Sequence, residues 1–288
     1  AGRPGAVDTV IEHLRYRLYP NDRNAVFMGV DDFLFQETET VEILSHVKYG
    51  SVRCVVTRTD QDALKGETAH TLVIPTTLKE IGPYAFAYMQ NLKRVVIPSS
   101  VRTIKRGAFA GCTNLSSITI EPGVRLIEGT SFAGTGITSI TIPNTVKDLQ
   151  TYVFEDCKKL KTVKLPDGIN KIGECLFMGC ESLTSVVVPP TVTEIGERAY
   201  YDCKSLSSVT LPEGLVKICD GAFSDTSLVI PSTVMEMGTW AFFCHKLAKV
   251  TLPARFNDAD VLVDVFDNSS TKLFGTSEAT LLQGFTFK

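Results

Sequence analysis

The sequence lacks most of the features that would mark an enzyme, a metal protein or a membrane protein. It has one Trp and four His residues, and no stretch approaches the roughly 18–20 apolar residues that a membrane span needs. No CxxC pair, Walker loop, dinucleotide fingerprint, HExxH or GxSxG motif occurs. The formal net charge of −3 gives no support for binding nucleic acid or anionic membrane. We therefore expect no catalytic residue, no cofactor, no metal site and no nucleic-acid partner.

What the sequence does contain is a repeat that starts at Leu72. The first units read LVIPTTLKEIGPYAF, VVIPSSVRTIKRGAF and ITIEPGVRLIEGTSF. Successive units are spaced by 22 or 23 residues, except for one interval of 19 residues after Leu211. Two columns keep this register. The aliphatic column at the end of each expected strand is Ile74, Ile97, Ile120, Ile142, Leu165, Val188, Leu211, Ile230 and Leu252. The aromatic column is Phe86, Phe109, Phe132, Phe154, Phe177, Tyr200, Phe223 and Phe242.

The order of residues within one unit predicts a flattened coil. A short strand such as Val95–Ile97 ends at Pro98, because proline cannot donate a hydrogen bond to a sheet. An apolar pair follows, then a turn that often contains glycine, for which we expect a positive φ angle. The aromatic residue comes next. One coil cannot bury these side chains alone, so the coils must stack. The glycines of this turn are Gly82, Gly173, Gly196 and Gly238.

The recurring IP step, IG step, AF pair and Cys resemble the consensus of the BspA-like leucine-rich-repeat family. The resemblance covers about residues 72–253, and departures occur at Glu121–Gly123 and at Leu149–Gln150. It implies a curved repeat solenoid with a parallel β-sheet face that is presented to partners. Members of the family occur on bacterial surfaces and in protists, are tied to adhesion and protein binding, and share no catalytic residues.

The two ends do not repeat cleanly. The apolar residues between Ala6 and Leu18 fit one face of a helix, so we expect an N-terminal capping helix, followed by strands near Val41–Leu44 and Ser51–Thr57. We predict a cap with a degenerate first rung over residues 1–71, a solenoid over 72–253 and a C-terminal cap over 254–288. In that last segment, Val261–Phe266 and Leu281–Phe287 have the composition of strands.

Five of the eight cysteines share one repeat position. Met89, Thr135 and Thr226 fill the same position in other units, so the slot requires a small, mostly apolar side chain. Side chains on stacked coils point in parallel, and we therefore expect buried free thiols rather than disulfides or a metal site. The cysteines of this column are Cys112, Cys157, Cys180, Cys203 and Cys244.

Two surfaces are candidates for binding a partner. The middle residue of each strand points away from the core and forms a neutral, β-branched face, although high strand propensity alone would also explain it. This face comprises Val73, Val96, Thr119, Thr141, Lys164, Val187, Thr210, Val229 and Thr251. The second candidate is a group of aromatic residues in and after the turn, a common kind of interface anchor if exposed. The group comprises Tyr84, Tyr152, Tyr201, Trp240 and Phe243.

These observations favour a non-catalytic, protein-binding or scaffolding solenoid with a role in surface adhesion or assembly. Two alternatives stay open: an intracellular structural component of a larger complex, and an enzyme or enzyme subunit whose chemistry lies outside the repeats. The resemblance points to a secreted or cell-surface location, whereas free thiols would point to the cytoplasm. The expected partners are proteins, and nothing in the sequence indicates a homo-oligomer.

Overall fold

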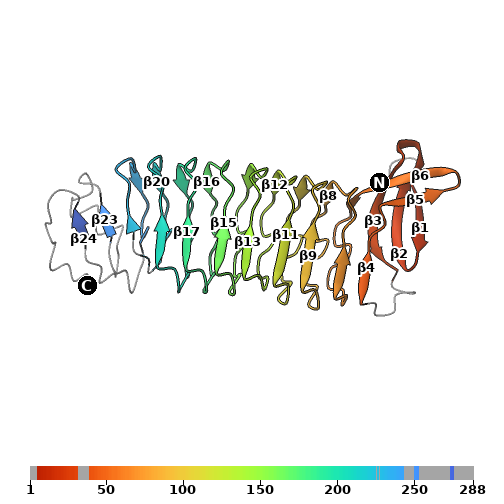
Figure 1. Ribbon diagram of the computed structural model, residues 1–288, viewed down its shortest axis with the longest axis horizontal. Helices are drawn as coiled ribbons and strands as arrows, with labels where there is room; N and C mark the ends of the chain where they lie inside the picture. The colour runs from red at the N-terminus through yellow and green to blue at the C-terminus, as the bar shows by residue number, and fades with distance from the viewer. Residues whose placement is uncertain are drawn as a thin grey trace. The chain divides into compact units, whose positions relative to one another are not determined.

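The computed structural model of this 288-residue chain describes residues 5–31, 39–224, 226, 228–242, 250–252 and 273–275. The chain divides into two compact units, residues 1–137 and 138–288. Within the described residues the only helical element is the 3-10 helix η1 (Pro20–Asp22), and the other regular elements are β-strands. In each unit the chain winds into stacked coils with parallel strands, which confirms the predicted repeat solenoid (Figure 1).

The predicted N-terminal capping helix over Ala6–Leu18 is wrong. Strands β1 (Val7–Ile11) and β2 (Leu14–Tyr19) form an antiparallel hairpin instead. The two residues between them, Glu12 and His13, have φ angles of 47° and 70°. A two-residue loop with both φ angles positive is the turn that matches the twist of paired strands.

The segment LRYRLY explains why a strand forms here. Leu14, Tyr16 and Leu18 are buried, while Arg15 is exposed, so the burial pattern has the period of two that defines a strand. Leu14 and Leu18 are also four residues apart, as on one face of a helix, and this spacing led to the prediction of a helix. Tyr16 packs against Phe27 with 5.5 Å between ring centroids, and its hydroxyl accepts the Leu44 backbone N–H at 3.1 Å.

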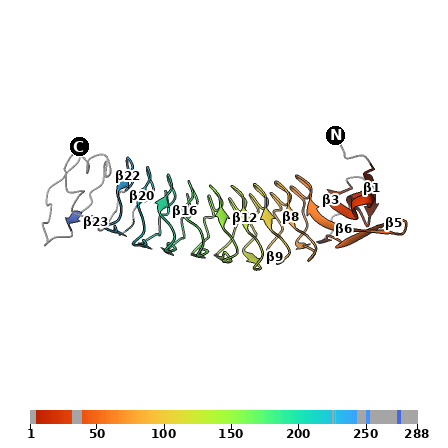
Figure 2. The ribbon, with the colours of Figure 1, turned by 90° about the horizontal axis from the view of Figure 1, so that it is seen from above.

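The hairpin belongs to a sheet that continues into the coils of the first unit (Figure 2). Strand β3 (Asn24–Val30) pairs antiparallel with β2 and parallel with β6 (Val52–Thr59), and β5 (His46–Tyr49) pairs antiparallel with β6. Strand β6 then pairs in parallel with β8 (Glu80–Ile81), a strand of the repeat. The strand predicted at Ser51–Thr57 therefore exists as β6, and that at Val41–Leu44 corresponds to β4 (Thr40–Glu42).

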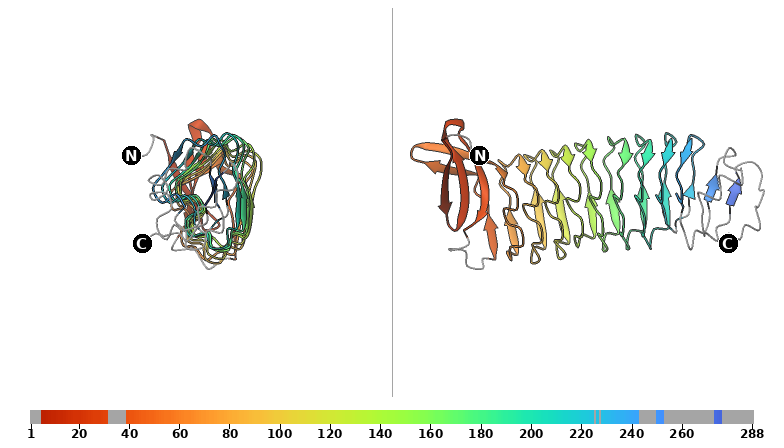
Figure 3. Two further views of the ribbon diagram at one scale, coloured as in Figure 1. Left: turned by 90° about the vertical axis from the view of Figure 1, so that its left-hand side faces the viewer. Right: turned by 180° about the vertical axis from the view of Figure 1, so that it is seen from behind.

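Each coil of the first unit contributes to two parallel ladders (Figure 3). The first ladder forms the strand face, where Val96 of one coil stands opposite Thr119 of the next. In it, β4 pairs with β7 (Thr71–Val73), and β9 (Arg94–Ile97) pairs with β11 (Ser117–Ile120). The second ladder comprises β8, β10 (Thr103–Ile104) and β12 (Leu126–Ile127).

The second unit repeats this plan. Its strand face comprises β13 (Ser139–Thr141), β15 (Thr162–Lys164), β17 (Ser185–Val187), β19 (Ser208–Thr210), β21 (Leu228–Val229), β23 (Val250–Leu252) and β24 (Leu273–Gly275). Strand β14 (Asp148–Leu149) comes first among its two-residue strands. A parallel ladder then joins β16 (Lys171–Ile172), β18 (Glu194–Ile195), β20 (Lys217–Ile218) and β22 (Glu236–Met237). The strands predicted at Val261–Phe266 and Leu281–Phe287 lie outside the described residues.

The aromatic column forms the centre of the core in both units, as predicted. All eight rings are fully buried. Consecutive ring centroids are 5.3 and 5.8 Å apart in the first unit and 5.2 to 5.8 Å apart in the second, where the rings stack nearly parallel. Such stacked rings contribute beyond their buried area.

The cysteine column packs beside these rings. Cys112, Cys157, Cys180 and Cys203 are free and fully buried, and Cys244 lies outside the described residues. The thiol of Cys180 donates a hydrogen bond to the carbonyl of Phe154, one coil earlier, at 3.1 Å. Burial raises the pKa of the Cys112 thiol to about 12. The column is therefore packing, as predicted.

The expected positive φ at the recurring turn glycines is wrong. Gly82, Gly173, Gly196 and Gly238 do not adopt it. A Cβ atom on Gly82 would instead lie 2.6 Å from the Thr59 carbonyl oxygen, so glycine is needed there for close approach of two coils. The left-handed conformation belongs to the residues two positions before each core aromatic. They are Tyr84, Gly107, Thr130, Tyr152, Cys175, Arg198, Gly221 and Trp240.

Candidate functional site

The strand face has the exposure that the sequence predicts. Val187 and Val229 are 69% and 68% exposed, and Val73 and Val96 are also exposed. The polar members of the face are exposed as well: Thr119, Thr141, Lys164 and Thr210. Thr251 lies in β23, beyond the residues whose side chains are described.

Two of the predicted strand-face residues border one hollow in the first unit. Val73 and Val96 line a depression of about 610 Å³ together with His70, Arg94 and Glu121. The Glu121 carboxylate accepts the Ser99 backbone N–H at 2.9 Å. This hollow is a broad depression on the sheet, with apolar and charged side chains mixed along it.

Among the turn aromatics, Tyr84 contacts the coils on both sides of its own. A Cβ atom on Gly107, one coil later, would lie 2.2 Å from Cε1 of Tyr84, so the ring packs closely against this glycine. The ammonium of Lys65 lies 5.6 Å from the ring centroid on the preceding coil, within the range of a cation–π contact. Tyr84 is accordingly half-buried and engaged within the chain.

Tyr152 is also engaged within its own unit. Its hydroxyl donates a hydrogen bond to the carboxylate of Glu174 on the next coil. This bond raises the pKa of the Tyr152 hydroxyl above its ordinary value. The side chain therefore ties two turns together.

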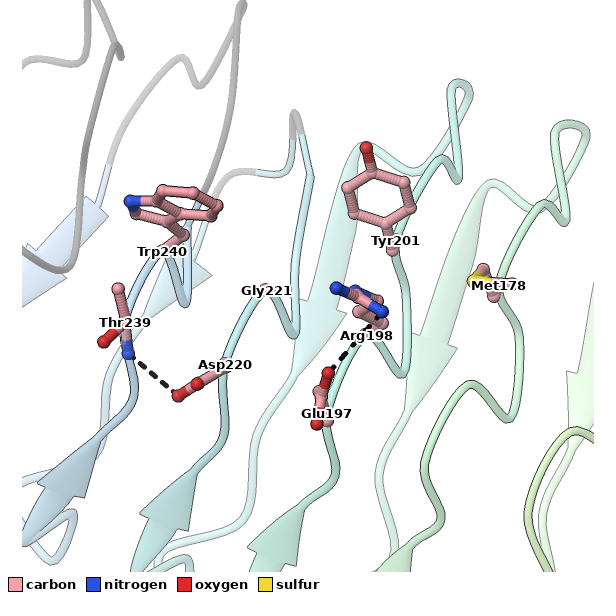
Figure 4. A pocket seen from close by; sticks show the side chains of 8 residues that line it. All are labelled: Met178, Glu197, Arg198, Tyr201, Asp220, Gly221, Thr239 and Trp240. Carbon is pink, nitrogen blue, oxygen red and sulfur yellow. Dashed lines mark hydrogen bonds and ion pairs between the residues drawn. The ribbon is translucent and has the colours of Figure 1, made fainter.

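Tyr201 and Trp240 differ from these two residues because they border an open hollow. They are 36% and 49% exposed, and they line a cavity of about 570 Å³ in the second unit. Figure 4 shows the two rings standing on either side of Gly221, with Arg198 below Tyr201. We call this cavity the aromatic hollow; it is lined by Met178, Glu197, Arg198, Tyr201, Asp220, Gly221, Thr239 and Trp240. Phe243, the remaining predicted aromatic, lies outside the described residues.

The aromatic hollow exists because the coil between the two rings carries small residues. Gly221 takes the turn position that Arg198 and Trp240 occupy on the neighbouring coils, and Ser224 takes the position of Tyr201. Ser224 is buried, and its hydroxyl donates to the Tyr200 carbonyl at 3.3 Å. Among the described residues at these two positions of the coil, no large side chain fills the space between the two rings.

The shortest repeat interval begins on the same coil. The chain takes 23 residues from Tyr200 to Phe223 and only 19 from Phe223 to Phe242. Parallel backbone hydrogen bonds nevertheless hold the three turns in step, from Arg198 N–H to the Asp220 carbonyl at 2.9 Å and from Gly221 N–H to the Thr239 carbonyl at 3.2 Å. The floor of the hollow is therefore fixed by main-chain bonds.

The charges around the aromatic hollow are unequally matched. Arg198 and Glu197 form an ion pair with 3.6 Å between nitrogen and oxygen, and both side chains are about half exposed. Asp220 accepts the Thr239 backbone N–H at 2.9 Å but has no ion pair within the described part of the chain. The lining thus carries two acids against one base, and one acid keeps its charge unbalanced.

Of the residues that line the aromatic hollow, only Tyr201 and Trp240 were predicted from the sequence. Arg198, Asp220 and Gly221 carry no motif, and they come together only because the coils stack. The sequence did contain one signal of this hollow. Gly221 lies at a turn position next to the shortest repeat interval, and the coils before and after it carry large side chains at the same position.

No other kind of site emerges from the described residues. Among them, no group of three or more His, Cys, Asp or Glu side chains could hold a metal ion. The part of the chain that the structure describes contains no helix with the length and apolar character to cross a membrane. A hollow of about 400 Å³ at the N-terminal hairpin is lined by the Asp8–Arg17 ion pair, with 2.7 Å between its closest atoms, and this pair is largely exposed.

Comparison with known proteins shows the family to which this repeat architecture belongs. The family model for the BspA type leucine-rich repeat region (6 copies) matches residues 57–183, 125–229 and 170–274, which together make up more than half of the chain. The chain belongs to this family. None of the curated proteins matches it.

Solved structures of other leucine-rich-repeat proteins resemble this BspA-type chain. A leucine-rich repeat protein from Bacteroides ovatus is 28% identical over 86% of this chain, with a TM-score of 0.79. This chain spans 65% of the length of that protein. The pneumococcal vaccine antigen PcpA is 16% identical over 85% of this chain and 81% of its own, with a TM-score of 0.55, which shows a shared fold.

Proposed function

We propose that this BspA-type chain is a non-catalytic, protein-binding scaffold that docks a partner at the aromatic hollow. One observation carries the proposal: Tyr201 and Trp240 stand exposed on either side of a hollow whose floor is held by main-chain bonds. Trp, Tyr and Arg are the residues most enriched among those that dominate binding energy at interfaces. Rigid rings also bind at a low entropic cost, because little side-chain freedom is lost.

The strand face is a second candidate for docking. Val187 and Val229 are the most exposed apolar side chains on it, and Val73 and Val96 border a hollow of about 610 Å³. A partner that lies across the sheet could bury these side chains. We place this surface second because singly exposed valines are also what strand propensity alone produces.

The family is generally non-catalytic, and we extend that character to this chain as part of the proposal. A role in adhesion or in assembly of a larger complex fits a scaffold of this kind. The partner would then be a protein at a cell surface or, in the alternative reading, another component of an intracellular complex.

Affinity capture with matched variants tests the proposal. The hollow variant Tyr201→Ala with Trp240→Ala and the face variant Val187→Asp with Val229→Asp should both fold, because all four side chains are exposed. We expect a partner that the wild-type chain captures to be lost from the hollow variant and retained by the face variant. The reverse result would move docking to the strand face, and capture by both variants would contradict both candidates.

A further inference from the structure

We infer that the aromatic hollow takes a positively charged side chain, a Lys or Arg presented by the partner protein. This inference rests on the proposed function, since it names the chemical group that the docking site would recognise. It is carried by three features of the hollow: two aromatic rings, an acid that forms no ion pair with any described residue, and a floor without a side chain.

The rings supply the first attraction. Tyr201 and Trp240 stand on two sides of the space above Gly221 (Figure 4). A cation within about 6 Å of an aromatic face is attracted by the negative charge density of the ring, and Trp attracts most strongly. The same chain already uses this contact internally, where the Lys65 ammonium lies 5.6 Å from the Tyr84 ring centroid.

The acid supplies the second attraction and decides the sign of the ligand. Arg198 is balanced by Glu197 at 3.6 Å, whereas Asp220 has no cationic partner among the described residues. Asp220 directly precedes Gly221, so its carboxylate lies at the foot of the hollow (Figure 4). An anionic ligand would meet this unbalanced charge, and a neutral one would leave it unpaired.

The described residues nearby do not cancel that charge. A smaller hollow shares Glu197 and Asp220 with the aromatic hollow and adds Lys217 and Glu236. Lys217 and Glu236 pair with each other at 3.6 Å, so they contribute no net charge. Among the described residues that line the two hollows, the acids therefore exceed the bases by one.

The floor gives a long side chain the room to enter. Gly221 presents no Cβ atom, and a Cβ built there would lie 3.4 Å from Cγ of Arg198. The cavity of about 570 Å³ can accept the methylene chain of Lys or Arg between the rings, with the charged end near Asp220. Met178 adds an apolar contact at the rim.

The chain contains its own reporter for this inference. Trp240 is the single tryptophan of the sequence, so intrinsic tryptophan emission reports on the aromatic hollow alone. We would titrate the full chain with three short peptides that differ only at two positions, which hold Lys, norleucine or Glu. We expect the Lys peptide to change the emission in a saturable, salt-sensitive manner, and the norleucine and Glu peptides to leave it unchanged.

Two variants sharpen the test. Asp220→Asn removes the charge of this carboxylate without changing the shape of the side chain. We expect it to raise the dissociation constant of the Lys peptide roughly fivefold or more. Glu213→Gln changes another exposed acid of the same unit that does not line the hollow, and it should leave the affinity unchanged. An affinity of the Asp220→Asn variant for the Lys peptide equal to that of the wild-type chain would overturn the inference.

Other outcomes separate this inference from the proposed function. Emission that responds to the Glu peptide, or to a methyl glycoside in place of the peptides, would overturn the assignment of a cation. If no peptide binds but capture of the partner still requires Tyr201 and Trp240, the hollow is a docking site that does not take a cation. If the Lys peptide binds but the hollow variant still captures the partner, the cation site is correct and the proposed function is wrong.

Discussion

Two turns of this molecule share a backbone conformation and differ in what they expose. Tyr84 in the first unit and Trp240 in the second occupy the same position of the repeat, with φ angles of 51° and 54°. Each has a glycine at the same position on an adjacent coil. Gly107 follows Tyr84 and packs closely against its ring, whereas Gly221 precedes Trp240 and lines a hollow beside it.

The difference shows that the position of an aromatic residue in the repeat does not decide its role. Tyr84 contacts Gly107 on the next coil and Lys65 on the preceding one. Trp240 and Tyr201 line a shared hollow. For this pair of residues, a glycine on the next coil packs on the ring of Tyr84, whereas the glycine before Trp240 leaves a hollow beside it.

We expect the largest loss of stability when a ring of the buried aromatic column is removed. Phe177 is fully buried, with ring centroids 5.6 Å from Phe154 and 5.4 Å from Tyr200. We expect Phe177→Ala to lower the free energy of unfolding by about 3–5 kcal/mol through the cavity it leaves. Chemical denaturation monitored by circular dichroism measures this loss, and a loss below about 1 kcal/mol would mean that the column is not the core.

The buried thiols predict a loss of stability at alkaline pH. Burial raises the pKa of Cys112 from 9.0 to about 12, so the folded chain holds this proton more tightly than the unfolded chain. Its contribution to stability is complete below pH 9.0 and is lost as the pH rises toward about 12. One such thiol accounts for about 1.4 kcal/mol per pH unit within that window.

The Cys112→Ala variant checks this assignment. Its free energy of unfolding, measured between about pH 8 and pH 11, should fall less steeply than that of the wild-type chain. An identical slope in both proteins would show that Cys112 titrates normally when folded.

The two glycines of the comparison should respond differently to a methyl group. An alanine in the left-handed conformation costs about 1–2 kcal/mol, which we expect for Gly221→Ala. Gly107→Ala should cost at least about 1 kcal/mol more, because the new Cβ must displace the Tyr84 ring that lies 2.2 Å from its position. Equal losses of unfolding free energy would mean that the Tyr84 ring moves aside without cost.

The smallest effects belong to the turn aromatics. Tyr84→Ala should lower the free energy of unfolding by about 1 kcal/mol, since it removes a half-buried ring that contacts Gly107 and Lys65 on the neighbouring coils. Trp240→Ala should change it by less than about 0.5 kcal/mol, as expected for an exposed side chain. A larger loss for Trp240 than for Tyr84 would reverse the distinction between packing and binding.

The repeat itself was predictable because its columns record burial directly. The aromatic residues, the cysteines and the aliphatic strand ends keep one register, and stacked coils are the only arrangement that buries them all. The N-terminal hairpin was not recognised because Leu14 and Leu18 satisfy a helical spacing, while the alternation with Arg15 that marks a strand spans only a few residues. The boundaries predicted at residues 71 and 253 stay predictions.

The site was predictable only in part. Exposure of Val187 and Val229 follows from alternation along a strand, and it was correctly expected. The aromatic hollow depends on which residues of three successive coils meet, and Asp220 and Arg198 are 22 positions apart in the sequence. No single repeat unit contains the information that brings them together.

The thiols inside the coils also affect how the compartment of this chain can be studied. The sulfur atoms of Cys112, Cys180 and Cys203 each donate to a main-chain carbonyl at 3.1 Å and are shielded from solvent. A high pKa makes them poor nucleophiles, so neither an oxidant nor an alkylating reagent meets a reactive group while the coil stays closed. Their labelling rate would therefore measure how often each coil opens. A count of unmodified cysteines would report on this local opening rather than on the redox state of the compartment in which the protein resides.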